Sequence, residues 1–200
     1  MKKDECSCID CGIVNCQYED RMFPEFCLSE KLKDETVSRV MTAYQDEANN
    51  KIMKAAARVE TDGYCRETRV EEIIRFAREI GAQKLGIATC VGLMEESRRL
   101  AKILRSHDFE VYGVACKVGV TPKSEVGIEK RCEEIGVSMC NPIMQAELLN
   151  QEGTDLNLVV GLCVGHDSLF YKSSEAFATT VVTKDRILGH NPAAALYTSE

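Results

Sequence analysis

Short apolar runs alternate with stretches of helical periodicity from Lys84 onward, and this alternation restricts the fold more than any other feature of the sequence. Strand, helix and strand in repetition are typical of a parallel sheet with helices on both faces, and strands covered on both faces are continuously apolar. We therefore predict an α/β domain with a five-stranded, mostly parallel, doubly wound sheet. Its strands are expected at Leu85–Cys90, Val111–Cys116, Val137–Cys140, Leu156–Cys163 and Phe177–Thr183.

Two helices are expected before the sheet. Apolar residues recur at steps of three and four from Val37 to Val59, which predicts one long helix over residues 30–60. A second amphipathic stretch predicts a helix over residues 67–80, followed by Gly81 where helices commonly end in glycine.

The segment before the long helix has no such periodicity and is rich in cysteine. It reads as an irregular knuckle that needs an outside constraint to hold its shape. We therefore expect two parts, a cysteine-rich metal-binding knuckle over residues 1–28 and an α/β domain over residues 29–200.

Eleven cysteines are the anomaly in a chain of 200 residues. The N-terminus has no apolar signal segment, so we expect a cytoplasmic protein whose cysteines are metal ligands or reactive thiols rather than disulfides. The longest nearly apolar stretch, Leu156–Gly165, is too short to span a bilayer, which argues against a membrane partner. A net charge of −7 argues against nucleic acid as a partner.

The densest signal is a cluster of thiols at spacings of two to eleven residues near the N-terminus: Cys6, Cys8, Cys11, Cys16 and Cys27. Closely spaced thiolates can surround one soft cation or an iron–sulfur cluster. The spacing lacks the second Cys-x-x-Cys half of a zinc ribbon and differs from the common ferredoxin runs. The pattern predicts a metal site and leaves zinc and iron–sulfur open.

A second group of thiols stands at the ends of four predicted strands: Cys90, Cys116, Cys140 and Cys163. Ligands of open parallel sheets bind outside the carboxyl ends of the strands, so we expect these thiols to line one cofactor- or ligand-binding crevice. Turns and helix N-termini that follow them favour thiolates. The alternative is that each is a small buried hydrophobic residue.

Cys163 and His166 form a Cys-x-x-His pair, a spacing that can place two ligands on one metal. That metal would occupy a second site or be shared with the knuckle. In a crevice without metal, Cys163 would instead be a nucleophile with His166 as its base. The run Lys184–Arg186 follows the last predicted strand, which would place it at the same edge of the sheet, but a solvent-exposed charge run is the commoner explanation.

Several of these motifs together resemble the family called domain of unknown function 1847, whose members are described as predicted metal-binding proteins. The resemblance implies metal binding through cysteines and no particular reaction. The motifs are Cys6-x-Cys8-x-x-Cys11-x4-Cys16, Leu85–Leu93, Cys116–Gly119, Cys140–Glu147, Gly161–Asp167 and Lys184–Pro192.

The leading functional hypothesis is a cytoplasmic, redox-related zinc or iron–sulfur protein with a thiol-lined crevice. Its partners would be the metal ion and a redox partner or small-molecule ligand. One alternative is a thiol enzyme that uses Cys163 with His166. Another is a non-catalytic module in which a zinc knuckle presents the long helix to a protein partner.

Overall fold

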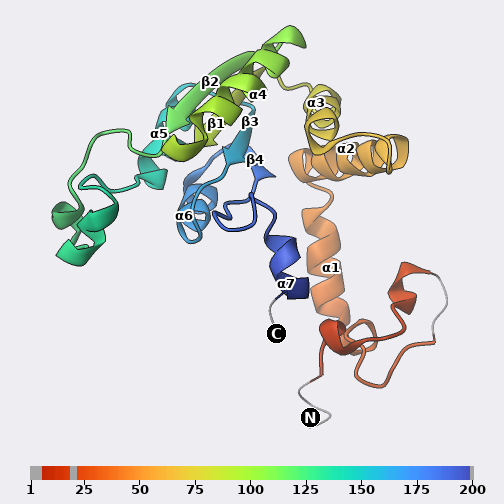
Figure 1. The fold of residues 1–200 in the computed structure, drawn as a ribbon. Helices are drawn as coiled ribbons and strands as arrows, with labels where there is room; N and C mark the ends of the chain where they lie inside the picture. The colour runs from red at the N-terminus through yellow and green to blue at the C-terminus, as the bar shows by residue number, and fades with distance from the viewer. Residues whose placement is uncertain (1–5, 19–21, 199–200) are drawn as a thin grey trace. The chain divides into compact units, whose positions relative to one another are not determined.

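Four parallel strands form one sheet in the C-terminal part of the chain (Figure 1). The α/β class and the parallel sheet predicted from the sequence are confirmed, with four strands rather than five. In the order β2-β1-β3-β4, the sheet comprises β1 (Lys84–Thr89), β2 (Glu110–Ala115), β3 (Leu156–Val160) and β4 (Phe177–Val182).

The computed structural model describes residues 6–18 and 22–198. The chain divides into two compact units, Met1–Lys54 and Ala55–Glu200, and each is described by itself. The expected boundary between residues 28 and 29 stays a prediction. No helix within the described part of the chain is long and apolar enough to cross a membrane.

Helices cover both faces of the sheet. On one face lies α4 (Met94–Ser106), where the buried Ser97 hydroxyl donates to Thr89 Oγ1 of β1 at 2.6 Å. On the other face, Ala88 of β1 belongs to a buried cluster with side chains of α5 (Pro142–Gln151) and α6 (His166–Ser173). Successive residues of a strand face opposite sides, so the β1 run is apolar on both faces.

The predicted strand at Val137–Cys140 is absent from the sheet. The Met139 N–H donates to the Thr121 carbonyl at 2.9 Å, and the Val137 carbonyl accepts from the Lys123 N–H at 3.1 Å. These bonds surround an isolated antiparallel bridge between residues 122 and 138. One side of this run is therefore paired with residues 121–123 instead of with a strand of the sheet.

Residues 117–140 thus form an excursion between β2 and α5. It contains two short 3₁₀-helices, η6 (Lys123–Val126) and η7 (Lys130–Ile135). Its base is closed where the Asn141 N–H donates to the Cys116 carbonyl at 2.7 Å. The Lys117 ammonium donates to the Ser138 carbonyl at 2.6 Å, which ties the two arms together. The chain therefore leaves the sheet at Cys116 and returns to the same place.

Two helices occupy the stretch where one long helix was predicted, α1 (Asp34–Ala43) and α2 (Glu47–Gly63). The Asp46 carboxylate accepts from the Asn49 N–H at 3.1 Å, and the Asn49 side chain donates to the Ala43 carbonyl at 3.0 Å. Asp and Asn side chains that satisfy helix ends in this way compete with a continuous helix. The apolar residues from Val37 to Val59 recur at steps of three and four in both helices, so the sequence pattern does not reveal the break between them.

The second predicted helix is confirmed as α3 (Arg69–Glu79), which begins with a capping box between Thr68 and Glu71. An ion pair of 2.7 Å between Arg58 and Glu79 links α2 to α3. The remaining elements are short: η2 (Cys8–Asp10), η3 (Asn15–Gln17), η4 (Ser29–Lys31), η5 (Val91–Leu93), η8 (Pro192–Ala194) and α7 (Ala195–Thr198).

Candidate functional site

Two of the strand-end thiols are neighbours across the sheet. Strands β1 and β2 pair up to Thr89 and Ala115, so Cys90 and Cys116 occupy the next register position on adjacent strands. The ladder continues there, because the Cys116 N–H donates to the Thr89 carbonyl at 2.8 Å. Both thiols lie on the face covered by α5 and α6, and both are nearly buried, at 8% and 3% exposure.

A third thiol reaches the same place by a different route. Cys140 ends the excursion and precedes Asn141, the N-cap of α5, whose side chain accepts from the Met144 N–H at 3.1 Å. The backbone bond between Asn141 and Cys116 holds Cys140 at the carboxyl edge of the sheet. Its thiol packs against the buried cluster that contains the Cys116 thiol, and it is half-buried.

An imidazole completes the row. His166 is the first residue of α6, and its ring lies beside the Cys140 thiol. This contact raises the pKa of His166. Its Nδ1 is buried and has no hydrogen-bond partner among the described residues. We call Cys90, Cys116, Cys140 and His166 the edge cluster.

The pKa values of the three thiols in the edge cluster differ. Contact with Cys140 and then with Cys90, together with burial, raises the pKa of the Cys116 thiol. Contact with Cys116, followed by that with His166, lowers the pKa of Cys140 to about 3. Contact with Cys116, then the Gly92 N–H, which donates to the Cys90 sulfur at 3.4 Å, and then Lys184 lower the pKa of Cys90 to about 5. The stable arrangement is a central thiol between two thiolates, each stabilised by a cation.

Cys163 lies apart from this row. The chain turns at Gly161 after β3, and the Cys163 sulfur accepts a hydrogen bond from Arg186 Nη2 at 3.1 Å. That contact, and after it the charges of Cys90 and Cys140, raise the pKa of Arg186. The Cys-x-x-His pair expected from the sequence is therefore split. Its thiol faces a guanidinium, while its imidazole faces a different thiol.

Three further residues shape this edge. Lys184 and Arg186 lie beside Cys90 and Cys163, which favours the edge position over the solvent-exposed charge run that was considered commoner. Their position directly after β4 was the signal for it, since parallel strands end at one edge. Fully buried Gln145 donates from Nε2 to the Thr89 and Val114 carbonyls, at 3.1 and 2.7 Å. No pattern in the sequence marked that residue.

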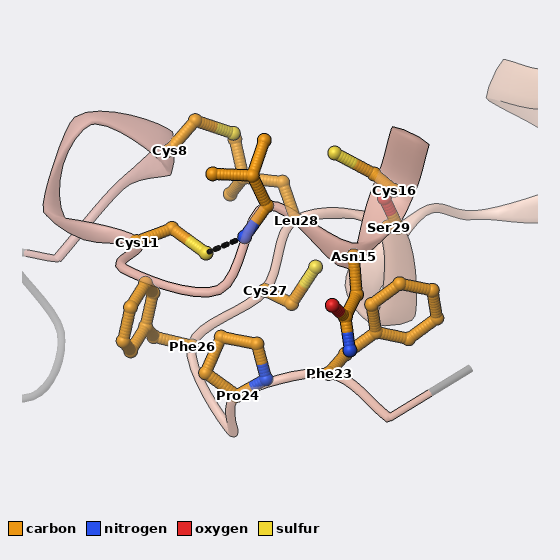
Figure 2. Close-up of a pocket in the computed structure, with 11 residues that line it drawn as sticks. Cys8, Cys11, Asn15, Cys16, Phe23, Pro24, Phe26, Cys27, Leu28 and Ser29 are labelled. Atoms are coloured by element: carbon orange, nitrogen blue, oxygen red, sulfur yellow. Dashed lines mark hydrogen bonds between the residues drawn. The ribbon is translucent and has the colours of Figure 1, made fainter. Parts of the chain in front are cut away.

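The cysteines of the N-terminal knuckle are held differently. Four of them line a single cavity of about 120 Å³, and Figure 2 shows their sulfur atoms turned toward a common space. None is in a disulfide, and the fifth, Cys6, is half-buried outside that lining. The four are Cys8, Cys11, Cys16 and Cys27.

One tight turn wraps a sulfur of the knuckle. Val14 has the left-handed φ of 54°, an uncommon conformation for a β-branched residue, and its N–H donates to the Cys11 sulfur at 3.5 Å. Among residues 6–18 and 22–28, none is buried. The knuckle therefore has thiols around a cavity but no hydrophobic core to hold them there.

Within residues 6–18 and 22–198, no three His, Cys, Asp or Glu side chains are grouped closely enough to hold a metal ion as they stand. The edge cluster is a row rather than a shell, because each group contacts only the next. In the knuckle, a bound metal would have to draw the four sulfurs inward across the cavity.

Comparison with known proteins identifies the family. The family described as "Protein of unknown function (DUF1847)" matches residues 27–181. An uncharacterized protein of Methanocaldococcus jannaschii, MJ0455, is 48% identical over 166 residues, which is 83% of this chain and 86% of that protein. Both matches confirm the resemblance noted in the motifs.

A solved structure, Dph2 from Pyrococcus horikoshii with a 4Fe-4S cluster, was also found. The match covers 48% of this chain and 22% of that structure, with 21% sequence identity and a TM-score of 0.29. This TM-score is too low to indicate a shared fold.

Proposed function

Since the chain belongs to the DUF1847 family, whose description names no activity, we propose a function from its own residues: it is a metal-thiolate protein whose N-terminal knuckle binds zinc or an iron–sulfur cluster. The observation that carries this proposal is the convergence of Cys8, Cys11, Cys16 and Cys27 on one cavity. Four thiolates are the donor set of structural zinc sites and of iron–sulfur clusters alike.

The energetics of the knuckle support the same conclusion. Residues 6–18 and 22–28 include no buried side chain, so their packing cannot offset the conformational entropy that ordering them costs. Structural metal ions supply that free energy directly, and small metal-binding domains are commonly unfolded without them. The hydrogen bond from Val14 to Cys11 is of the kind that orients a ligand and offsets the charge of a metal-bound thiolate.

The four cysteines fit a zinc ion and an iron–sulfur cluster alike, but the two groups would give the knuckle different functions. Zinc would fix the fold of the knuckle and do no redox chemistry. An iron–sulfur cluster would supply one-electron transfer, and its potential would depend on hydrogen bonds to sulfur and on exposure. The cavity of about 120 Å³ exceeds the roughly 30 Å³ that one water occupies, so it leaves room for more than a single ion.

The test is the metal content of the full chain after anaerobic purification, with iron, zinc and acid-labile sulfide measured together. We expect stoichiometric zinc, or iron with sulfide. Cys11→Ser and Cys27→Ser should each lower the content at least severalfold, because each removes one of four ligands. The matched control is Cys132→Ser, which changes a half-buried thiol outside both cysteine groups.

Two results would overturn the proposal. One is full-chain protein that holds no metal under these conditions. The other is metal that is retained in full by Cys11→Ser and Cys27→Ser but lost from Cys116→Ser, which would move the site to the sheet edge.

A further inference from the structure

The edge cluster contains a pair of thiols that the fold brings together from separate segments. Cys116 follows β2, and Cys140 returns to it after the excursion, held by the backbone bond from Asn141 to the Cys116 carbonyl. The Cys140 thiol packs against the buried cluster that contains Cys116, and the two thiols shift each other's pKa. A disulfide between them would close the base of a loop that is already closed by hydrogen bonds.

The two thiols differ in exposure and in charge. Cys140 is half-buried and therefore accessible to a small molecule, whereas Cys116 is 3% exposed. Cys140 also lies beside His166, while Cys116 retains its proton between two thiolates. Cys140 is thus suited to be the attacking thiolate and Cys116 to be the resolving thiol. Dithiols that reduce disulfides have these two roles.

The surroundings of the cluster favour an anionic ligand over a metal cation. Lys184 lies beside Cys90, Arg186 binds the Cys163 sulfur, and Lys117 lowers the pKa of Cys140 through its charge. These cations offset the charges of the two thiolates, Cys90 and Cys140, which weakens the attraction for a divalent cation and favours an anionic molecule.

We propose that the edge cluster is a dithiol–disulfide redox site that acts on small anionic disulfides, with Cys140 as the attacking thiolate and Cys116 as the resolving thiol. This proposal does not depend on the metal site of the knuckle, because the two rest on different cysteines. In this proposal His166 stabilises the Cys140 thiolate, whereas the sequence suggested that it would act as the base for Cys163.

The reaction balances as two displacements. The Cys140 thiolate attacks one sulfur of the substrate disulfide, its S–S bond breaks, and one substrate thiolate leaves. Cys116 gives its proton to that thiolate, and its sulfur attacks Cys140 in the mixed disulfide. The second substrate thiolate then leaves. The two protein sulfurs lose two electrons and become a disulfide, the substrate becomes one thiol and one thiolate, and a dithiol reductant restores the site.

The test uses reduced full-chain protein under anaerobic conditions with two probes, anionic oxidised glutathione and cationic cystamine. Peptide mapping by mass spectrometry should find a Cys116–Cys140 disulfide. Cys116→Ser should accumulate a glutathione mixed disulfide on Cys140. Oxidised glutathione should react about tenfold faster than cystamine at low ionic strength, and added salt should reduce that ratio.

Cys65→Ser is the matched control, because it removes an exposed thiol outside the cluster and should change neither product nor rate. If Cys116→Ser does not fold, the time course of the unaltered chain replaces it: the mixed disulfide on Cys140 should precede the Cys116–Cys140 disulfide.

Three outcomes would overturn the proposal. They are a mixed disulfide on Cys140 no more abundant than that on Cys65, equal rates with the two probes, and a metal that protects Cys116 and Cys140 until it is chelated. The last outcome would make the edge cluster a metal site.

Discussion

The knuckle and the edge cluster both gather thiols, but they do so by different means. In the knuckle, four cysteines from one short segment surround a cavity, and none of the described residues 6–18 and 22–28 is buried to hold them. In the edge cluster, each thiol stands at the end of a strand or helix of a well-packed sheet, and its neighbours are fixed by register and backbone bonds.

This difference separates two kinds of cysteine chemistry. Where thiols have no scaffold, the free energy of a bound metal can provide one, and the thiolates are neutralised by the ion itself. Where a scaffold exists, the protein can stabilise thiolates with its own cations, as it does with Lys184 beside Cys90 and His166 beside Cys140. Such thiolates remain available to react.

The largest expected effect follows from removal of the metal. A chelator should abolish amide-exchange protection throughout the knuckle and leave β1 and β3 unchanged, because structural zinc supplies about 10–16 kcal/mol to small sites that lack a core. Hydrogen exchange with mass spectrometry on the loaded full chain measures both regions at once. Equal loss of protection in the strands would show that the two regions are not independent in stability.

A smaller effect tests the scaffold of the edge. Gly161 has φ +60°, and a Cβ there would lie 2.0 Å from Leu93 Cδ1, whereas Gly153 has φ +63° and open space around it. Gly153→Ala should cost about 1 kcal/mol of unfolding free energy for the backbone alone. Gly161→Ala should cost about 3 kcal/mol, because a steric clash is added. Urea unfolding compares them.

The metal content of the knuckle should be the same in both glycine variants. If the two substitutions lower the free energy of unfolding equally, the turn after β3 is not fixed by its contact with Leu93. The edge of the sheet would then be a less rigid scaffold for the thiols than we infer.

The smallest effect is a pH profile. Thiol alkylation follows the thiolate fraction, and an ordinary cysteine with a pKa near 8.5 loses about tenfold in rate per pH unit as the pH falls. Because the pKa of Cys140 is lowered to about 3, its rate should change less than about twofold between about pH 7 and about pH 5. Iodoacetamide labelling with peptide mapping checks this, with free cysteine as the reference.

His166→Gln sharpens the same measurement. Removal of the imidazole should raise the pKa of Cys140, so the labelling rate should begin to fall at a higher pH than in the unaltered chain. If the labelling rate of the variant also stays constant with pH, Cys116 alone lowers the pKa of Cys140. A tenfold fall in labelling rate per pH unit in the unaltered chain would contradict the lowered pKa.

The sequence by itself determined the elements that depend on local pattern. Apolar runs and their helical neighbours predicted four of the strands and their parallel direction, and hence that Cys90 and Cys116 end at one edge. The spacing of the N-terminal cysteines indicated a thiol cluster, because residues so close in sequence cannot be far apart in space. Family membership was likewise visible in the motifs.

Only the tertiary structure decided which groups meet across long separations. Val137–Cys140 has the composition of a strand, but its backbone bonds to residues 121–123 remove it from the sheet and return Cys140 to Cys116. His166 faces Cys140 rather than Cys163, and Arg186 takes the Cys163 sulfur. Periodicity reports which face a residue lies on, whereas the partner it meets depends on how loops close, and no local pattern encodes that.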